Sequence, residues 1–155
     1  MFETVKYCGR NERKEGALGK GCLKKYKKIA AEKDKLRILV VDDDENIREI
    51  LKDLFMMSGH QVFLSGNGEE ALEIFFREEF DLIITDLGMP GISGWEVNRR
   101  IKENHPEKPV VIISGWGAQL NEEEVKASKV DFIIPKPFSL EQMLNVTERF
   151  NQKNP

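Results

Sequence analysis

Carboxylates, a hydroxyl and an ammonium group each follow one of four short apolar runs in this chain. The runs are residues 37–41, 82–85, 110–113 and 132–134, and the polar residues after them are, in the same order, Asp42 with Asp43, Asp86, Ser114 and Lys136. If the runs are parallel strands of one sheet, their carboxyl ends lie along one edge, where open α/β sheets bind ligands. We therefore expect the functional site at that edge.

The acids at this edge indicate a metal site. Asp42, Asp43 and Asp44 are consecutive, and another predicted strand brings Asp86 to the same edge. Carboxylates this close repel one another unless a cation is present. Magnesium prefers octahedral oxygen ligands, often one or two carboxylates completed by waters and phosphate oxygens. Mg²⁺ is therefore the cofactor that we expect.

Asp86 then has two possible roles. It can be a metal ligand, or it can be the nucleophile toward a phosphoryl group, as carboxylates are in some covalent mechanisms. Ser114 and Lys136 favour the nucleophile, because a phosphoryl group beside carboxylates needs a cation and hydrogen-bond donors on its far side. Asp44 is the acid best placed to cap the following helix instead.

The rest of the pattern predicts the elements that position these residues. Short apolar runs alternate with amphipathic stretches, which is typical of a parallel sheet with crossover helices. The expected strands lie near residues 37–41, 61–64, 81–85, 109–113 and 131–134, and the expected helices near 45–57, 68–78, 95–103, 119–128 and 140–150. Two helix starts have the spacing of a capping box, Asn67 with Glu70 and Ser139 with Gln142.

Charge divides the chain near residue 35. Residues 1–35 contain eleven Lys or Arg and five acids, whereas residues 36–155 contain thirteen and twenty-two. A length of 155 residues suits one domain with an appendage. We therefore expect a domain over residues 36–152 and a basic N-terminal segment or linker over residues 1–35.

Composition argues against several classes of protein. No apolar run approaches the roughly 20 residues of a transmembrane helix, and the first ten residues lack the apolar stretch of a signal peptide. Cys8 and Cys22 have no nearby histidine, so we interpret them as reduced surface thiols, with a disulfide or a metal site as the alternatives. We expect a cytoplasmic protein without a membrane span.

Four motifs resemble the receiver domain of two-component response regulators. They are ILVVDDD at residues 38–44, DLIITDLGMPGISG at 81–94, VIISG at 111–115 and PKPF at 135–138. Each motif is weak alone, but the four in this order and spacing are specific, and the resemblance covers residues 36 to about 152. It implies a flavodoxin-like, doubly wound α/β fold, with a five-stranded parallel sheet in the order 2-1-3-4-5 and helices on both faces.

The resemblance also implies roles for the acids. Asp86 would be the residue that is phosphorylated, and it would also bind Mg²⁺. Asp42 and Asp43 would complete the metal site with the backbone carbonyl of Gly88. The phosphoryl donor would be a sensor histidine kinase or a histidine phosphotransfer protein, and output would come through changed protein–protein contacts of a monomer or a phosphorylation-dependent dimer. The domain would assist its own phosphorylation without being a dedicated enzyme.

Other positions match or depart from the family pattern. Ser114 would be the hydroxyl that moves onto the phosphoryl group, and Lys136 would pair with that group. The Lys136–Pro137 peptide bond is cis in the family, which we expect here too. Ile133 stands where the family often has an aromatic switch residue. At a position that affects water access, the chain has Trp116, and we hypothesise that this side chain shields the phosphoryl group.

Three other functions share some of these features. An FMN-binding flavodoxin would have the same architecture, but the acids at residues 42–45 would repel its phosphate, so we reject it. A phosphatase or phosphotransferase of the haloacid dehalogenase type also uses a nucleophilic aspartate with Mg²⁺, but it typically has a second acid where this chain has Gly88. Clustered lysines can neutralise nucleic-acid phosphates. The N-terminal segment lacks a helix-turn-helix pattern, however, so nucleic acid is not the partner that we expect.

Overall fold

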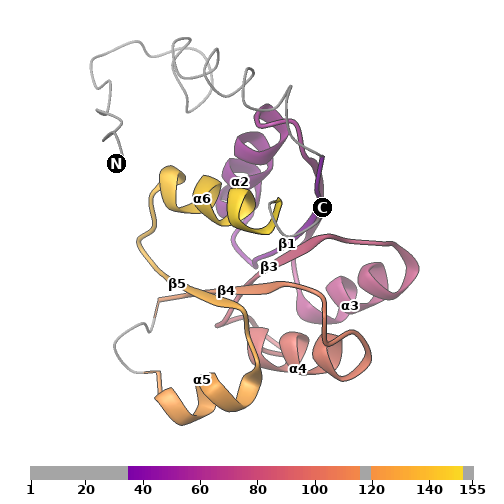
Figure 1. Ribbon diagram of the computed structural model, residues 1–155, viewed down its shortest axis with the longest axis vertical. Helices are drawn as coiled ribbons and strands as arrows, with labels where there is room; N and C mark the ends of the chain where they lie inside the picture. The colour runs from indigo at the N-terminus through magenta and orange to yellow at the C-terminus, as the bar shows by residue number, and fades with distance from the viewer. Residues whose placement is uncertain (1–34, 116–119, 152–155) are drawn as a thin grey trace.

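The computed structural model describes residues 35–115 and 120–151 of the chain. Within these ranges the chain folds into a parallel sheet with helices on both of its faces (Figure 1). No helix in the two ranges is long and apolar enough to cross a membrane. The predictions for Cys8, Cys22 and Trp116 concern positions outside the described residues.

Five strands form the sheet in the predicted order, β2-β1-β3-β4-β5. The strands are β1 (Arg37–Val41), β2 (Gln61–Ser65), β3 (Leu82–Asp86), β4 (Val110–Ser114) and β5 (Phe132–Pro135). Every residue of β3 and β4 is buried, because helices cover both faces of a parallel sheet. The strand order reverses between β1 and β3, and such a switch point opens a crevice at the carboxyl ends of the strands.

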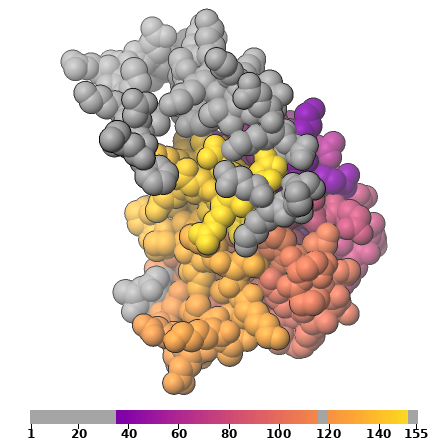
Figure 2. All heavy atoms as spheres, viewed as in Figure 1, coloured from indigo at the N-terminus to yellow at the C-terminus, as the bar shows by residue number. Residues whose placement is uncertain are grey.

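Helices cover the two faces of this sheet. They are α2 (Glu45–Met57), α3 (Gly68–Arg77), α4 (Gly94–Asn104), α5 (Glu122–Ser128) and α6 (Leu140–Asn151). In Figure 1, α2 and α6 lie above the sheet, whereas α3, α4 and α5 lie below it. In the same view with all atoms drawn, α5 forms the lower end of the described part (Figure 2).

Each face of the sheet has its own apolar core. Alternate residues of β1 divide between the two cores, because successive side chains of a strand point to opposite faces. The first core joins α2 and α6 to the sheet and includes Ile38, Leu51, Phe55, Ile84, Met143 and Phe150. The second joins α3 and α4 to the other face and includes Leu39, Ala71, Phe75, Ile83, Val97 and Ile101.

Side chains at the helix starts explain where the helices begin. Asp44 is the N-cap of α2, as predicted, and Asn67 caps α3 by accepting a hydrogen bond from the backbone N–H of Glu70. Ser139 and Gln142 form a reciprocal capping box, in which each backbone N–H donates to the other residue's side chain, at 2.7 and 3.1 Å. These contacts satisfy donors that the first turn of a helix leaves free.

α5 begins later than the sequence pattern predicts. The pattern indicates a start near residue 119, whereas the first helical residue is Glu122. Asn121 is the N-cap, and its side chain accepts a hydrogen bond of 2.9 Å from the backbone N–H of Glu123. The three acids of the first turn are exposed, as expected for a solvated helix face.

Two aspartates tie neighbouring strands together at the amino edge of the sheet. The Asp81 carboxylate accepts a 2.8 Å hydrogen bond from the N–H of Arg37, and the N–H of Asp81 donates back to the Arg37 carbonyl. Asp131 makes the same reciprocal pair with Val110 and also binds the ammonium of Lys102 at 2.6 Å. The first backbone groups of β1 and β4 are thereby satisfied.

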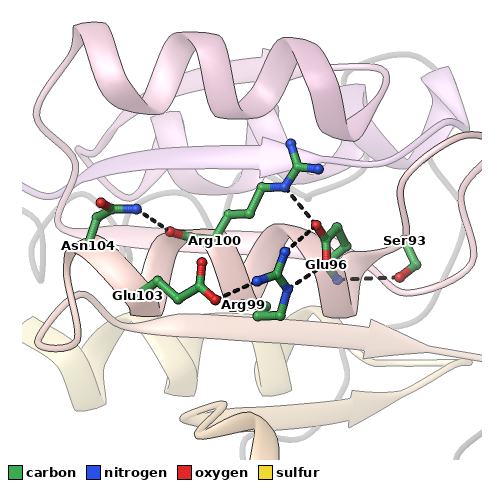
Figure 3. Close-up of polar contacts among 6 residues, drawn as sticks. All are labelled: Ser93, Glu96, Arg99, Arg100, Glu103 and Asn104. Carbon is green, nitrogen blue, oxygen red and sulfur yellow. Dashed lines mark hydrogen bonds and ion pairs between the residues drawn. The ribbon is translucent and has the colours of Figure 1, made fainter.

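An ion-pair network lies on the outer face of α4 (Figure 3). Arg99 and Arg100 both bind the Glu96 carboxylate at 2.7 Å, and Arg99 also pairs with Glu103. Hydrogen bonds from the two guanidinium groups lower the pKa of Glu96 to about 2. The backbone N–H of Glu96 donates to Ser93, the N-cap of α4. Because Arg99, Arg100 and Glu103 are exposed, we assign this network a helix-supporting role and only a small contribution to the stability of the whole domain.

Candidate functional site

Three carboxylates meet at the carboxyl edge of the sheet, where the sequence predicted them. Asp42 follows β1, Asp43 lies in the next loop, and Asp86 ends β3. Each offers an oxygen that lies within 4.8 Å of an oxygen of the other two. Asp42 and Asp86 are only 1% and 5% exposed, whereas Asp43 is exposed. The cluster therefore has a buried floor and an open side.

Lys136 is the cation of this cluster. Its Nζ lies 2.7 Å from Asp86 Oδ1 and 3.3 Å from Asp42 Oδ2. The backbone N–H of Lys136 donates to the carbonyl of Ser114 at 2.7 Å, and the Lys136–Pro137 bond is cis, as predicted. The segment after β5 thus turns the ammonium back over the carboxyl ends of β1 and β3.

The charges in the cluster shift two pKa values. Burial raises the pKa of Asp42, and the nearby charge of Asp86 adds to this effect, although the Asp44 N–H and Lys136 oppose it. Burial alone would lower the pKa of Lys136, but its hydrogen bonds and ion pairs with Asp86 and Asp42 outweigh burial and raise it. The cluster therefore favours an additional positive charge.

The loop after β1 fixes the Asp42 side chain and backbone. The backbone N–H of Asp44 donates to Asp42 Oδ1 at 2.9 Å, so one carboxylate oxygen has a defined direction. Arg48, one turn into α2, donates from Nη1 to the Asp42 carbonyl at 2.6 Å. Sequence reasoning missed this role of Arg48, because a contact with a backbone carbonyl six residues earlier leaves no characteristic pattern.

Gly94 brings the start of α4 against the backbone of Asp86. A Cβ at this position would lie 2.3 Å from the Asp86 carbonyl oxygen, which is far inside van der Waals contact. The Gly94 N–H donates to the Leu87 carbonyl at 3.0 Å, and the Thr85 hydroxyl donates to the Asp86 carbonyl at the same distance. The position of Asp86 therefore depends on α4. Gly94 is part of the quoted motif, but its close approach to Asp86 was not predicted.

The remaining predicted residues border the cluster. Ser114 is fully buried at the end of β4, and the neighbouring Ile113 pairs in register with Asp86. Gly88 is exposed two residues after Asp86, and a Cβ there would meet no atom within 4 Å. Ile133 lies in β5 and lines an open groove of about 700 Å³ that extends to Lys136. The predicted residues Asp42, Asp43, Asp86 and Lys136 therefore lie together at one sheet edge, with Ser114 and Gly88 beside them.

The donor atoms fit a hard divalent cation. All three acidic side chains offer oxygen ligands, and the exposed Asp43 leaves room for waters or phosphate oxygens to complete an octahedral shell. Lys136 neutralises only part of the charge of the three carboxylates. The site chemistry therefore favours Mg²⁺ together with an anionic phosphoryl group.

Comparison with protein families identifies the domain. A family model described as the response regulator receiver domain matches residues 38–148. This chain belongs to that family. The receiver domain is 32% identical over 114 residues to the response regulator protein FleR of Pseudomonas aeruginosa, covering 73% of this chain and 24% of FleR. It is 33% identical over 109 residues to the response regulator MprA of Mycobacterium leprae, covering 70% of this chain and 48% of MprA. The chain thus spans at most about half the length of these two relatives.

Solved structures give the same result for the fold. The chemotaxis response regulator CheY4 of Vibrio cholerae is 25% identical, with a TM-score of 0.69 over 76% of this chain and 99% of that one. The response regulator TrrA of Thermotoga maritima, described as a complex with Mg²⁺ and BeF, is 33% identical, with a TM-score of 0.68 over 74% of this chain and 98% of that one. These matches do not favour the phosphatase or nucleic-acid alternatives.

Proposed function

We propose that this receiver domain accepts a phosphoryl group on Asp86 in a Mg²⁺-dependent reaction. The observation that carries the proposal is the meeting of three carboxylates and the Lys136 ammonium at one edge of the sheet. Structural ion pairs alone do not account for this arrangement, since two carboxylates are buried side by side and both pair with the same ammonium group, that of Lys136. With a metal ion and a phosphoryl group bound, the carboxylates would pair with the metal ion and the Lys136 ammonium would pair with the phosphoryl oxygens.

The reaction transfers the phosphoryl group from a phosphohistidine of the donor protein. An oxygen of the Asp86 carboxylate attacks phosphorus, the P–N bond breaks, and the released imidazole nitrogen keeps the electron pair and takes up a proton from solvent. Lys136 lies 2.7 Å from Asp86 Oδ1 and stabilises the charge that develops on the transferred oxygens. When bound, Mg²⁺ supplies further neutralisation of these oxygens.

Other residues hold the metal ion and respond to the phosphoryl group. Asp42, Asp43, Asp86 and the carbonyl of Gly88 are the proposed Mg²⁺ ligands. Ser114, buried at the end of β4, is the proposed hydroxyl that turns toward the phosphoryl group. The added charge then changes the surface contacts of the domain.

Treatment with a small phosphodonor tests the proposal. Acetyl phosphate with Mg²⁺ should add one phosphoryl group per chain, seen as a single mass increment that alkaline treatment removes. Omitting Mg²⁺, or changing Asp86→Asn, should abolish it. Asp53→Asn is the matched control, because Asp53 is an exposed acid of α2 outside the cluster. Labelling that persists in Asp86→Asn would refute the assignment.

We infer the wider organisation from the same family. Residues 36–152 form the receiver domain, and residues 1–35 form a separate basic segment or linker. A sensor histidine kinase or a histidine phosphotransfer protein in the cytoplasm donates the phosphoryl group, and the output is a change in protein–protein contacts rather than turnover of a substrate. Sedimentation before and after phosphorylation distinguishes a constant monomer from a phosphorylation-dependent dimer.

A further inference from the structure

α5 is held loosely to the rest of the domain. No residue of α5 is buried, although the structure describes all seven of them. On the side of β5, the open groove is lined by α5 residues such as Val125 and by Ile133 of the strand. An element with so little apolar burial opens locally at low free-energy cost. Specific polar contacts therefore decide where α5 sits.

One such contact comes from Asn98, in the middle of α4. Its Nδ2 donates a hydrogen bond of 2.7 Å to the backbone carbonyl of Ser128, the last residue of α5. A helix supplies no backbone N–H for the carbonyls of its last turn. In α5 the Ser128 hydroxyl donates to the Val125 carbonyl at 2.7 Å, and the Lys129 nitrogen lies 3.4 Å from the Lys126 carbonyl oxygen, but neither contact reaches the Ser128 carbonyl. Asn98 therefore caps α5 from a neighbouring helix.

The other half of the Asn98 side chain has no partner. Asn98 is fully buried, and its Oδ1 makes no hydrogen bond among the residues that the structure describes. An unpaired buried acceptor lowers stability, whereas an apolar side chain of similar size would fill the space without this cost. Packing against the sheet therefore does not explain why residue 98 is an asparagine. The hydrogen bond from its side chain to Ser128 does explain it.

The same helix reaches the proposed phosphorylation site. Gly94, one turn before Asn98, lies against the Asp86 carbonyl so closely that a Cβ would clash at 2.3 Å. We therefore expect a shift of the Asp86 backbone to move α4 and, through Asn98, to act on the end of α5. α4 is a continuous helix from Gly94 to Asn104, so it can transmit such a shift.

We propose that Asn98 is a positioning residue that fixes α5 against α4 in the unmodified domain and sets how far α5 responds to a phosphoryl group on Asp86. The response to phosphorylation rests on the proposed function, whereas the fixing of α5 does not. The hydrogen bond of the Asn98 side chain goes to Ser128 of α5, so Asn98 acts on the phosphoryl site through α4.

Amide hydrogen exchange of Asn98→Leu tests the positioning role. Loss of the bond should raise the exchange rate of the α5 amides roughly threefold to tenfold, with the amides of α2 and α6 unchanged. Asn104→Leu is the matched control, because Asn104 is an exposed residue of the same helix that bonds only to the Arg100 carbonyl of its own helix (Figure 3). Equal α5 exchange in Asn98→Leu and wild type would overturn the proposal.

Beryllofluoride with Mg²⁺, a stand-in for the phosphoryl group, tests the response. It should change α5 exchange in wild type and in Asn104→Leu, and change it less in Asn98→Leu. A full response in Asn98→Leu would overturn the inference even where acetyl phosphate labels Asp86 normally. Failure of that labelling in wild type would instead refute the proposed function.

A wild-type measurement covers the case in which Asn98→Leu does not fold. The side-chain NH₂ signals of Asn98 are followed by NMR as beryllofluoride and Mg²⁺ are added. A shift in these signals, or a change in their exchange, supports the proposal. Signals that stay unchanged while those of the Asp86 loop move would contradict it.

Discussion

The fold buries the carboxylate of Asp42 beside that of Asp86, and burying the charged form of Asp42 lowers the free energy of unfolding. Its pKa is raised above 3.8, chiefly by burial, so the folded state binds a proton at this site more readily than the unfolded chain does. The contribution of Asp42 to the free energy of unfolding therefore falls as the pH rises through the interval between 3.8 and the raised pKa. Above that interval, the ionised Asp42 destabilises the metal-free domain.

We predict that Asp42→Asn raises the free energy of unfolding at neutral pH without Mg²⁺, by about 1 kcal/mol. The amide keeps the shape of the side chain and removes the cost of burying a charge together with the repulsion from Asp86, and Lys136 keeps its 2.7 Å partner Asp86. Urea unfolding between about pH 4 and 7 measures the effect. Without Mg²⁺, the free energy of unfolding of the wild type should fall relative to that of the variant as the pH rises. This relative decline should disappear when Mg²⁺ is added.

Asp53→Asn controls for a general loss of negative charge, because Asp53 is exposed and outside the cluster. It should leave both the pH dependence and the Mg²⁺ effect as in wild type. Asp42→Asn should also lose most of the stabilisation that Mg²⁺ gives, since one of the proposed ligands is removed. A lower stability of Asp42→Asn at neutral pH without Mg²⁺ would show that Asp42 stabilises the fold as an ion.

The residues to which we assign a role at the site or in positioning α5 divide into those that the sequence could predict and those that it could not. Asp86 and Lys136 were predictable, because the runs before them fix the strands and parallel strands share a carboxyl edge. Asn98 was not, since its partner Ser128 is thirty residues away. Within α4 it occupies a position that the helical pattern alone assigns to the core. Contacts of this kind depend on how two helices cross, which the sequence pattern does not encode.

At the scale of elements, α4 combines a charged outer face with a glycine at its first residue. The glycine matters more for the site, because it allows the helix to start against the Asp86 carbonyl. We predict that Gly94→Ala lowers the free energy of unfolding by about 1–3 kcal/mol, since the backbone must move to admit a methyl group. It should also slow labelling of Asp86 by acetyl phosphate. Urea unfolding and labelling kinetics measure the two effects.

Gly115→Ala is the control for Gly94→Ala. Among the described residues, a Cβ at Gly115 would meet no atom within 4 Å, so a methyl group fits there without movement of the described backbone. Its free energy of unfolding should stay close to that of the wild type. Equal stabilities of the two variants would mean that α4 is free to withdraw from Asp86, which would also weaken the link between Asp86 and Asn98.

The elements themselves were largely predictable. Each strand lies within one residue of its expected position, because apolar runs flanked by polar residues mark buried strands well. The observed starts of α2 and α6 agree with the predicted ones, because their N-caps, Asp44 and Ser139, can be recognised from the local sequence. α5 was predicted too long at its start, since its weak apolar pattern gave no boundary and the Asn121 cap was not considered. Local capping chemistry therefore carries more positional information than periodicity does.

At the scale of the whole molecule, every proposed site residue and both cores lie within residues 36–150. We predict that a chain starting at Lys35 keeps its thermal unfolding midpoint within a few degrees and is labelled on Asp86 at the same rate. The basic segment, residues 1–34, would then not be needed for folding or for phosphorylation of the receiver domain. Calorimetry and acetyl phosphate labelling of the two chains provide the comparison.

Slower labelling of the shortened chain would contradict the division at residue 35. Labelling at several salt concentrations then identifies the cause, because an electrostatic contribution of the basic segment weakens as salt rises. The full-length chain at high salt should in that case behave like the shortened one. A difference that is independent of salt would instead indicate that the segment belongs to the folded domain.

The reciprocal bonds of Asp81 and Asp131 lie at the amino rim of the sheet, on the opposite side from the reactive cluster. Strand alignment and signalling chemistry are thereby separated in space. Replacements that tighten the amino rim are consequently a route to a more heat-tolerant version of this domain. Its capacity to take up and lose phosphate would remain as it is.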